Sequence, residues 1–309
     1  MHNRSWLIVP GDNESKLGKS SRTGADAVIV DLDSSVPQDA KAYARQMTAQ
    51  WLDAHRHRVL EKRPVARWVR INTLESGFWR DDLSAVMPLA PDGIVLPKTL
   101  GPDMVRQLAA ELYEFEQRHQ IPSGRTKILP TVGETPRSVM SITSYMESPH
   151  QRLFGFSWQA DELAAALGAS RKFDAAGNWV GGFQYARAQT LLTAHACGAI
   201  AVETLHSDWS DREGLKAAAV ASRADGFSGM LAIHPDQVPI INEAFTVSEE
   251  ELGAAQRIVE AFDENPTASV LQVDRRMVDQ PQLTLARRML GLDGPGGQAT
   301  AREPILKLA

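Results

Sequence analysis

Residues 127–135 read KILPTVGET, a short apolar run that passes through Gly133 and ends at the carboxylate of Glu134. An apolar run bounded by Gly and Pro is typical of a buried strand. A charge at the end of such a strand is costly to bury unless it is paired or binds a metal ion. The stretch therefore predicts a buried strand whose exit either reaches water or faces a functional site.

Further apolar runs of this kind alternate with segments of helical character along the chain. The runs are, in order, 6–9, 27–30, 68–71, 93–96, 128–132, 153–158, 199–202 and 230–233. The helical segments are 13–23, 37–55, 81–88, 102–119, 138–146, 160–168, 184–196 and 211–225. This alternation predicts an α/β fold, a (β/α)₈ TIM barrel, over residues 1–245. A doubly wound sheet has the same alternation, but no GxGxxG follows the first run. The sixth run, with Phe-Gly-Phe-Ser-Trp, could also be a loop.

The pattern changes after about Ala244, and residues 246–309 are predicted to form a C-terminal helical extension or lid. Ser248 is a suitable N-cap for an amphipathic helix over 249–263, and a short strand-like piece and another helix follow. The piece VDRRMVDQP has too little apolar content for a core of its own. We therefore expect this segment to lie over a barrel mouth, either its own or that of a neighbouring protomer.

Composition limits the classes of function. The formal net charge is −5, which argues against nucleic acid as the main partner. The sequence contains no run of about 18 apolar residues, so no membrane span is predicted. The first residues also lack the apolar core of a signal peptide. A single cysteine, Cys197, excludes an intramolecular disulfide and fits a reducing cytoplasm.

Polar residues stand at nearly every predicted strand exit. They are Asp12, Asp31, Asp33, Arg70, Asn72, Lys98, Glu134, Thr135, Asp161, Glu162, Glu203, Thr204 and His234. Strands can end in polar loops for structural reasons alone. In a barrel, however, the exits converge on the face where active sites lie, so together these residues favour catalysis.

The residue types at the exits restrict the chemistry. Glu134 with Glu162, or with Asp161, could hold Mg²⁺, which prefers a few carboxylates plus water and substrate oxygens. Arg70 could bind a substrate carboxylate through a bidentate fork, although a salt bridge to Asp31 or Asp33 is the structural alternative. A metal beside an arginine stabilises negative charge developing on an oxygen. This set predicts cleavage or formation of a carbon–carbon bond next to a carbonyl.

The chain also resembles a known family through several motifs. These are RSWLIVPGDNESKLGKSSRTGADAVIVDLDSSV, RWVRINTLESGFWRDDL, GIVLPKT, GFSGMLAIHPDQVPIINEAFTVSEEEL and MVDQP. Together they look like the citrate lyase beta subunit family, which includes malyl-CoA lyase and belongs to the HpcH/HpaI aldolase superfamily. The resemblance runs from about Arg4 to Arg288 and implies a Mg²⁺-dependent barrel, trimeric or hexameric, that acts on acyl-CoA and keto acids.

Roles follow from the resemblance motif by motif. It implies that Arg70 binds the substrate carboxylate and that Glu134 and Glu162 bind the metal. Asp279 in MVDQP matches an acid that, in malyl-CoA lyase-like members, reaches into a neighbouring subunit's site. The family's Asp-Leu-Glu-Asp-Ala-Val is here DLDSSV, so Ser34 stands where the family has an acid, and the usual Glu-Asp pair is inverted to Asp161-Glu162. These departures are typical of a divergent member.

We therefore predict a Mg²⁺-dependent lyase that cleaves or forms a 3-hydroxy acid or its CoA thioester. Arg70 and the metal would hold the keto-acid portion, with Lys98 and His234 as further substrate-binding candidates. Asp279, or a water held by Asp33, would act as the general base. The alternatives are a CoA-independent pyruvate or oxaloacetate aldolase, and a catalytically silent barrel that binds a small acid.

Overall fold

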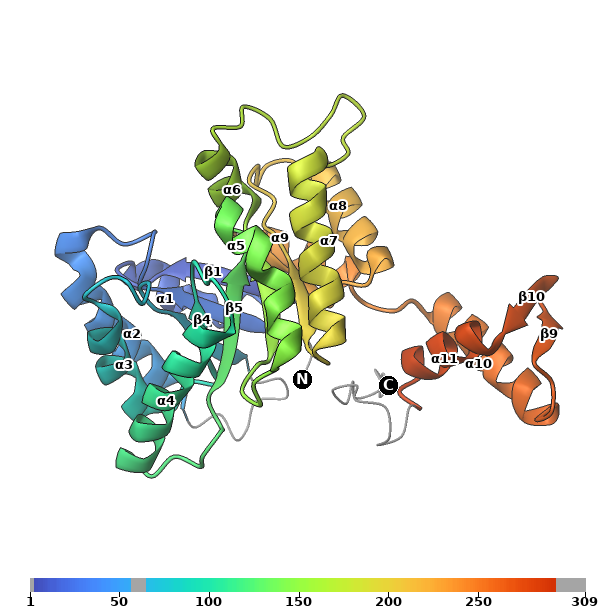
Figure 1. Cartoon of the computed structure of the whole chain (residues 1–309), viewed down its shortest axis with the longest axis horizontal. Helices are drawn as coiled ribbons and strands as arrows, with labels where there is room; N and C mark the ends of the chain where they lie inside the picture. The colour runs from blue at the N-terminus through green and yellow to red at the C-terminus, as the bar shows by residue number, and fades with distance from the viewer. Residues whose placement is uncertain (1–2, 57–64, 293–309) are drawn as a thin grey trace. The chain divides into compact units, whose positions relative to one another are not determined.

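The computed structural model describes residues 3–56 and 65–292. Parallel strands β1 to β8 pair in sequence order and close where β1 pairs with β8, so the predicted barrel is confirmed (Figure 1). The strands are β1 (Ser5–Pro10), β2 (Ala27–Asp31), β3 (Ala66–Arg70), β4 (Gly93–Leu96), β5 (Lys127–Val132), β6 (Gly155–Trp158), β7 (Ile200–Glu203) and β8 (Gly229–Ala232). The sixth apolar run is thus a strand rather than a loop, although it begins two residues later than expected.

Helices surround the strands (Figure 1). They are α1 (Glu14–Ser20), α2 (Lys41–Ala54), α3 (Trp79–Val86), α4 (Pro102–Arg118), α5 (Pro136–Ser141), α6 (Ala160–Leu167), α7 (Gly181–Ala196), α8 (Arg212–Asp225) and α9 (Gln237–Ala244). Short 3₁₀ turns η1 (Gln38–Ala40), η2 (Met87–Leu89) and η3 (Ile142–Glu147) adjoin α2, α3 and α5. Helix α9 has no counterpart among the predicted helical segments, and its buried Val238 and Ile241 pack into the core outside the barrel.

The inside of the barrel changes from apolar to polar towards the carboxyl ends of the strands. Trp6 and Trp68 fill its interior edge to face, with ring centroids 5.2 Å apart. A Cβ on Gly93 would lie 2.1 Å from the Trp68 ring, so a side chain at that position would displace the tryptophan. Because successive side chains in a strand alternate, Arg70 points inward like Trp68, two residues earlier. Asp31 lies beside it and completes a polar layer at the end of the barrel.

A second compact unit begins at Thr246. Helix α10 (Glu249–Glu264) starts at the predicted N-cap, where Ser248 and Glu251 form a capping box. Strands β9 (Val270–Val273) and β10 (Arg276–Asp279) form an antiparallel hairpin, and α11 (Gln280–Met289) follows.

The second unit has a small apolar core of its own, formed by Ala255, Val259, Phe262, Val278, Leu283 and Ala286. The piece VDRRMVDQP contributes only Val278 to the buried residues of this core, and α10 and α11 supply the rest. The apolar stripe of α10 packs against α11 and the hairpin, because their apolar side chains are sufficient to cover it. Throughout residues 3–56 and 65–292, no helix has the length and apolar content needed to cross a membrane.

Candidate active site at the carboxyl ends of the strands

Four predicted site residues come together at the carboxyl ends of the barrel strands. Arg70 ends β3, Asp33 follows β2, Glu134 follows β5 and Glu162 lies in the first turn of α6. The charges of Arg70, Glu162 and Asp33 all act on the carboxyl group of Glu134. The structure therefore assembles one arginine and three carboxylates from separate parts of the chain into one electrostatic group.

Glu134 is the most buried carboxylate of this group, with only 3 % of the residue exposed. Its Oε2 accepts a hydrogen bond from the backbone N–H of Lys98. Burial raises the pKa of Glu134 to about 7; the Lys98 N–H and the charge of Arg70 oppose the rise, while the charges of Glu162 and Asp33 add to it. A buried carboxylate beside two others favours a bound cation, which would offset both burial and repulsion.

Arg70 makes a bidentate ion pair with Asp31, which was the structural alternative to its predicted substrate-binding role. Its Nε and Nη2 donate to the two carboxylate oxygens of Asp31, each at 2.7 Å, and Nη2 also donates to Ser34 Oγ at 2.6 Å. Although burial alone would raise it, the pKa of Asp31 is lowered by the charge and hydrogen bonds of Arg70. Within the described ranges nothing accepts a hydrogen bond from Nη1 of Arg70, which leaves this donor unpaired in a residue that is 6 % exposed.

The loop after β2 holds Asp33 beside this guanidinium. The buried ammonium of Lys41 donates to the backbone carbonyls of Leu32 and Asp33 at 2.6 and 2.7 Å, which fixes the loop. In the described part of the chain, the Asp33 carboxylate has no hydrogen-bond donor. Burial raises its pKa, against the opposing charge of Arg70. Asp33 is thus a carboxylate held near Arg70 and free to accept a proton.

The two consecutive acids at the start of α6 lie in different environments. Asp161 is exposed and paired with Lys172 and Ser207, the latter at 2.6 Å. Glu162 is half-buried, and its charge acts on Glu134. Neighbouring residues of a helix point in different directions, which explains the separation. Over residues 3–56 and 65–292 no group of three or more His, Cys, Asp or Glu side chains is arranged to hold a metal ion, so Glu134 and Glu162 remain the candidate pair.

His234 follows β8, and its ring stacks on Trp209 with centroids 4.5 Å apart. The buried side chain of Gln237 accepts hydrogen bonds from the backbone N–H groups of Ile233 and His234, and donates to the carbonyl of His206 at 2.9 Å. Gln237 was not among the predicted site residues. Its position in the quoted IHPDQ motif was the available signal, and its role is to tie the loops after β7 and β8 together.

Other polar exits have structural roles. Glu203 is buried and accepts hydrogen bonds from Trp158 Nε1 and Arg187 Nε, both at 2.6 Å, and from Ser222 Oγ at 3.0 Å. Asn72 is bound to the carboxylate of Asp82. The expectation that exit residues face one mouth is therefore wrong for these two, which cross-link the barrel to its helices.

Comparison with known proteins gives the family of this chain. Residues 4–235 match the HpcH/HpaI aldolase/citrate lyase family. The chain belongs to this family.

Among similar members of the HpcH/HpaI family is the citrate lyase subunit beta-like protein of Deinococcus radiodurans. It is 32% identical over 293 residues, which cover 93% of this chain and 96% of that protein. The (3S)-malyl-CoA thioesterase of Cereibacter sphaeroides (strain ATCC 17023) is 29% identical, with 93% of each chain covered. The crystal structure of CitE from Mycobacterium tuberculosis with magnesium, acetoacetate and coenzyme A superposes with a TM-score of 0.72. It is 27% identical to this chain, and the match covers 94% of this chain and 97% of CitE.

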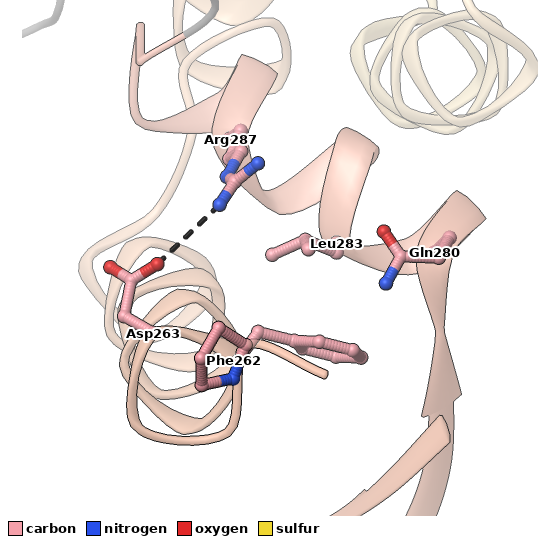
Figure 2. Close-up of a pocket in the computed structure, with 6 residues that line it drawn as sticks. Phe262, Asp263, Gln280, Leu283 and Arg287 are labelled. Carbon is pink, nitrogen blue, oxygen red and sulfur yellow. Dashed lines mark hydrogen bonds and ion pairs between the residues drawn. The ribbon is translucent and has the colours of Figure 1, made fainter. Parts of the chain in front are cut away.

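Asp279, the remaining predicted site residue, lies in the second unit. Its side chain caps α11, where it forms a capping box with Gln282. A pocket of about 420 Å³ lies between α10 and α11, and Figure 2 shows the ion pair between Asp263 and Arg287 at its edge, with atoms 3.4 Å apart. Asp279 does not line this pocket, and its observed role is the cap of α11, while a role at a barrel mouth stays a prediction.

Proposed function

We propose that this chain is a Mg²⁺-dependent carbon–carbon lyase, which cleaves or forms a 3-hydroxy acid or its CoA thioester. The products of cleavage would be a keto acid and the corresponding acid or acyl-CoA. The observation that carries the proposal is the group formed by Glu134, Glu162, Asp33 and Arg70 at the end of the barrel. The magnesium, acetoacetate and coenzyme A named in the related CitE crystal structure support the same class of ligands.

Glu134 and Glu162 are the residues that would hold the metal. Both offer hard carboxylate oxygens, and Mg²⁺ is commonly bound through one or two carboxylates, with water and substrate oxygens completing the shell. The burial of Glu134 and its repulsion by neighbouring carboxylates fit a bound cation. When bound, Mg²⁺ would stabilise negative charge that develops on a substrate oxygen.

Arg70 would orient the keto-acid portion through Nη1. Asp31 and Ser34 hold the other edge of the guanidinium, so its direction is fixed before substrate arrives. A guanidinium held in one direction would suit the planar carboxylate of the substrate. Lys98, whose side chain is exposed and whose charge acts on Asp33, and His234 would bind further polar groups of the substrate.

Asp33 would serve as the general base, directly or through a water molecule. In the cleavage direction it would take the proton of the substrate hydroxyl, and that oxygen would become the carbonyl of the keto acid. The adjacent carbon–carbon bond breaks, and its electron pair passes to the carbon next to the acyl group, which then takes a proton. The raised pKa of Asp33 supports a role in accepting a proton. Asp279 would supply a second acid, from the same or a neighbouring protomer of a homotrimer or homohexamer.

Isothermal titration calorimetry with Mg²⁺ tests the metal assignment. Glu134→Gln replaces a charged ligand by a neutral amide, so we expect the Mg²⁺ affinity to fall at least tenfold, roughly the effect of one charge-assisted contact. Glu162→Gln should also weaken binding. Asp161→Asn is the matched control, because its carboxylate is paired with Lys172, and its affinity should stay within about twofold of wild type. Equal affinity in wild type and Glu134→Gln would contradict the proposal.

A thioesterase is the second candidate, because a relative 29% identical over 93% of the chain is a (3S)-malyl-CoA thioesterase. Incubation with 3-hydroxyacyl-CoA thioesters distinguishes the two. A lyase releases a keto acid and keeps the thioester, whereas a thioesterase releases free CoA thiol and the hydroxy acid. Turnover of the free hydroxy acid alone would indicate the CoA-independent aldolase, and no Mg²⁺-dependent turnover of either substrate would indicate a binding protein.

A further inference from the structure

Lys98 has an unusual backbone for its place in the fold. Its φ is +50°, in the left-handed region that costs a residue with a side chain roughly 1 kcal/mol or more. Four other described residues other than glycine have positive φ, and each has a local reason. Ala90 and Gln120 lie where η2 and α4 end, and Asp274 and Arg275 form the turn between β9 and β10. Lys98 belongs to neither kind of turn.

The hydrogen bonds around Lys98 account for this conformation. The N–H of Lys98 donates to Oε2 of Glu134, and the next N–H, of Thr99, donates to the carbonyl of Thr131 at 3.3 Å. The hydroxyl of Thr99 donates to the same carbonyl at 2.9 Å. Consecutive N–H groups of an extended strand point to opposite edges. Both can reach groups of β5 and its exit only if the chain turns at Lys98.

The partner side of this contact is also left-handed. Gly133, immediately before Glu134, has φ +73°, and a Cβ there would make only ordinary contacts at 3.7 Å or more. Glycine adopts this conformation without the steric penalty that lysine carries. The two strand exits therefore turn towards each other, and the conformational cost lies on Lys98.

We propose that Lys98 is a positioning residue whose left-handed backbone holds the Glu134 carboxylate for Mg²⁺ binding. The inference rests on the proposed function, since it assigns the metal to Glu134. It separates the role of the Lys98 backbone from that of its exposed ammonium, which remains at the mouth near Asp33. Substitutions at position 98 should then affect metal affinity according to their backbone preference and not according to their charge.

Three variants separate backbone from charge. Lys98→Val introduces a β-branched residue that resists positive φ, so the Mg²⁺ affinity measured by calorimetry should fall roughly tenfold. Lys98→Gly adopts the conformation readily and should stay within about twofold of wild type. Lys98→Met keeps an unbranched side chain without the charge, and should also stay within about twofold.

Gln120 provides the matched control. It is exposed, lies beyond the end of α4 and has φ +56°, so Gln120→Val and Gln120→Gly repeat the conformational change away from Glu134. Both should leave Mg²⁺ affinity unchanged while thermal unfolding reports their effects on stability. Wild-type protein that binds no Mg²⁺ would contradict the proposed function. Wild-type binding with equal affinity in Lys98→Val would overturn only the role of Lys98.

A measurement on the wild-type protein covers the case in which Lys98→Val does not fold. With lysine amides labelled by ¹⁵N, the Lys98 N–H should resonate downfield, as expected for a hydrogen bond to a carboxylate, and should shift on addition of Mg²⁺. The resonance is assigned by its disappearance in Lys98→Met. A Lys98 resonance that does not respond to a saturating Mg²⁺ concentration would overturn the inference.

Discussion

Glu134 makes the stability of the metal-free protein depend on pH. Its folded-state pKa of about 7 exceeds the ordinary value of 4.5, so between these values the folded protein binds more protons than the unfolded chain. Its contribution to the free energy of unfolding is therefore greatest below about pH 4.5 and falls as the pH rises to about 7. The full loss is roughly 3 kcal/mol.

We expect metal-free wild type to lose stability relative to Glu134→Gln between pH 5 and 8, as measured by urea unfolding of both proteins at each pH. The difference between the two proteins removes the titration of other groups. Saturating Mg²⁺ at pH 8 should restore the stability of wild type and have a smaller effect on the variant. If the free energies of unfolding of wild type and Glu134→Gln change in parallel across this pH range, Glu134 does not carry a buried, uncompensated charge.

Arg70 combines a structural and a functional role, and two substitutions separate them. Arg70→Ala leaves the fully buried Asp31 without its partner and should lower the free energy of unfolding by roughly 3–5 kcal/mol. Arg70→Lys keeps the charge but loses the Nη1 donor proposed for the substrate, together with the fork that fixes its direction on Asp31, so catalytic efficiency should fall roughly 10- to 100-fold. Arg106→Ala is the control, because its pair with Asp103 is exposed and should be worth under about 1 kcal/mol. Unchanged efficiency in Arg70→Lys would restrict Arg70 to its ion pair.

The strand exits show what residue patterns can and cannot predict. The apolar runs located all eight barrel strands, because strands buried on both faces read as continuous apolar segments. The direction of each exit side chain depends on register, which polarity alone does not give. Arg70 follows the inward Trp68 by two residues, whereas Glu203 follows the inward Val202 by one and so points outward to Arg187. The residue types of the proposed site could be predicted from the exits, but which exit side chains point inward and which cross-link the barrel to its helices could not.

The hairpin in the second unit was not predicted, because its turn lacks the glycine that usually marks such a turn. Its turn residues, Asp274 and Arg275, both have positive φ, the geometry of a type I′ turn, in which glycine is usual at the second position. Arg275→Gly should therefore stabilise the protein by roughly 0.5–1 kcal/mol, because it removes the strain at φ +63°. Thermal unfolding measures the gain. Arg276→Gly, one residue into β10, should instead destabilise, and equal effects of the two substitutions would argue against the turn assignment.

The whole chain consists of two units, each with its own apolar core, and the proposed catalytic acids are divided between them. Glu134 belongs to the barrel, whereas Asp279 caps α11 in the second unit. A capping aspartate uses one carboxylate oxygen for the helix and leaves the other able to accept a proton. The cap on α11 is therefore compatible with the predicted role of Asp279 as an acid at a barrel mouth.

Subunit mixing tests whether that site lies on a neighbouring protomer of the proposed homo-oligomer. Asp279→Ala and Glu134→Gln proteins should each be nearly inactive, because each lacks one group of the site. After exchange, an acid acting in trans would join an intact barrel to an intact Asp279 and restore about a quarter of wild-type activity, the share expected from random pairing in a closed ring. Asp263→Ala in place of Asp279→Ala is the control, since it alters an acid of the same unit and should be active before mixing. Mass spectrometry must show that subunits have exchanged, and no recovery in such a mixture would confine Asp279 to its own protomer.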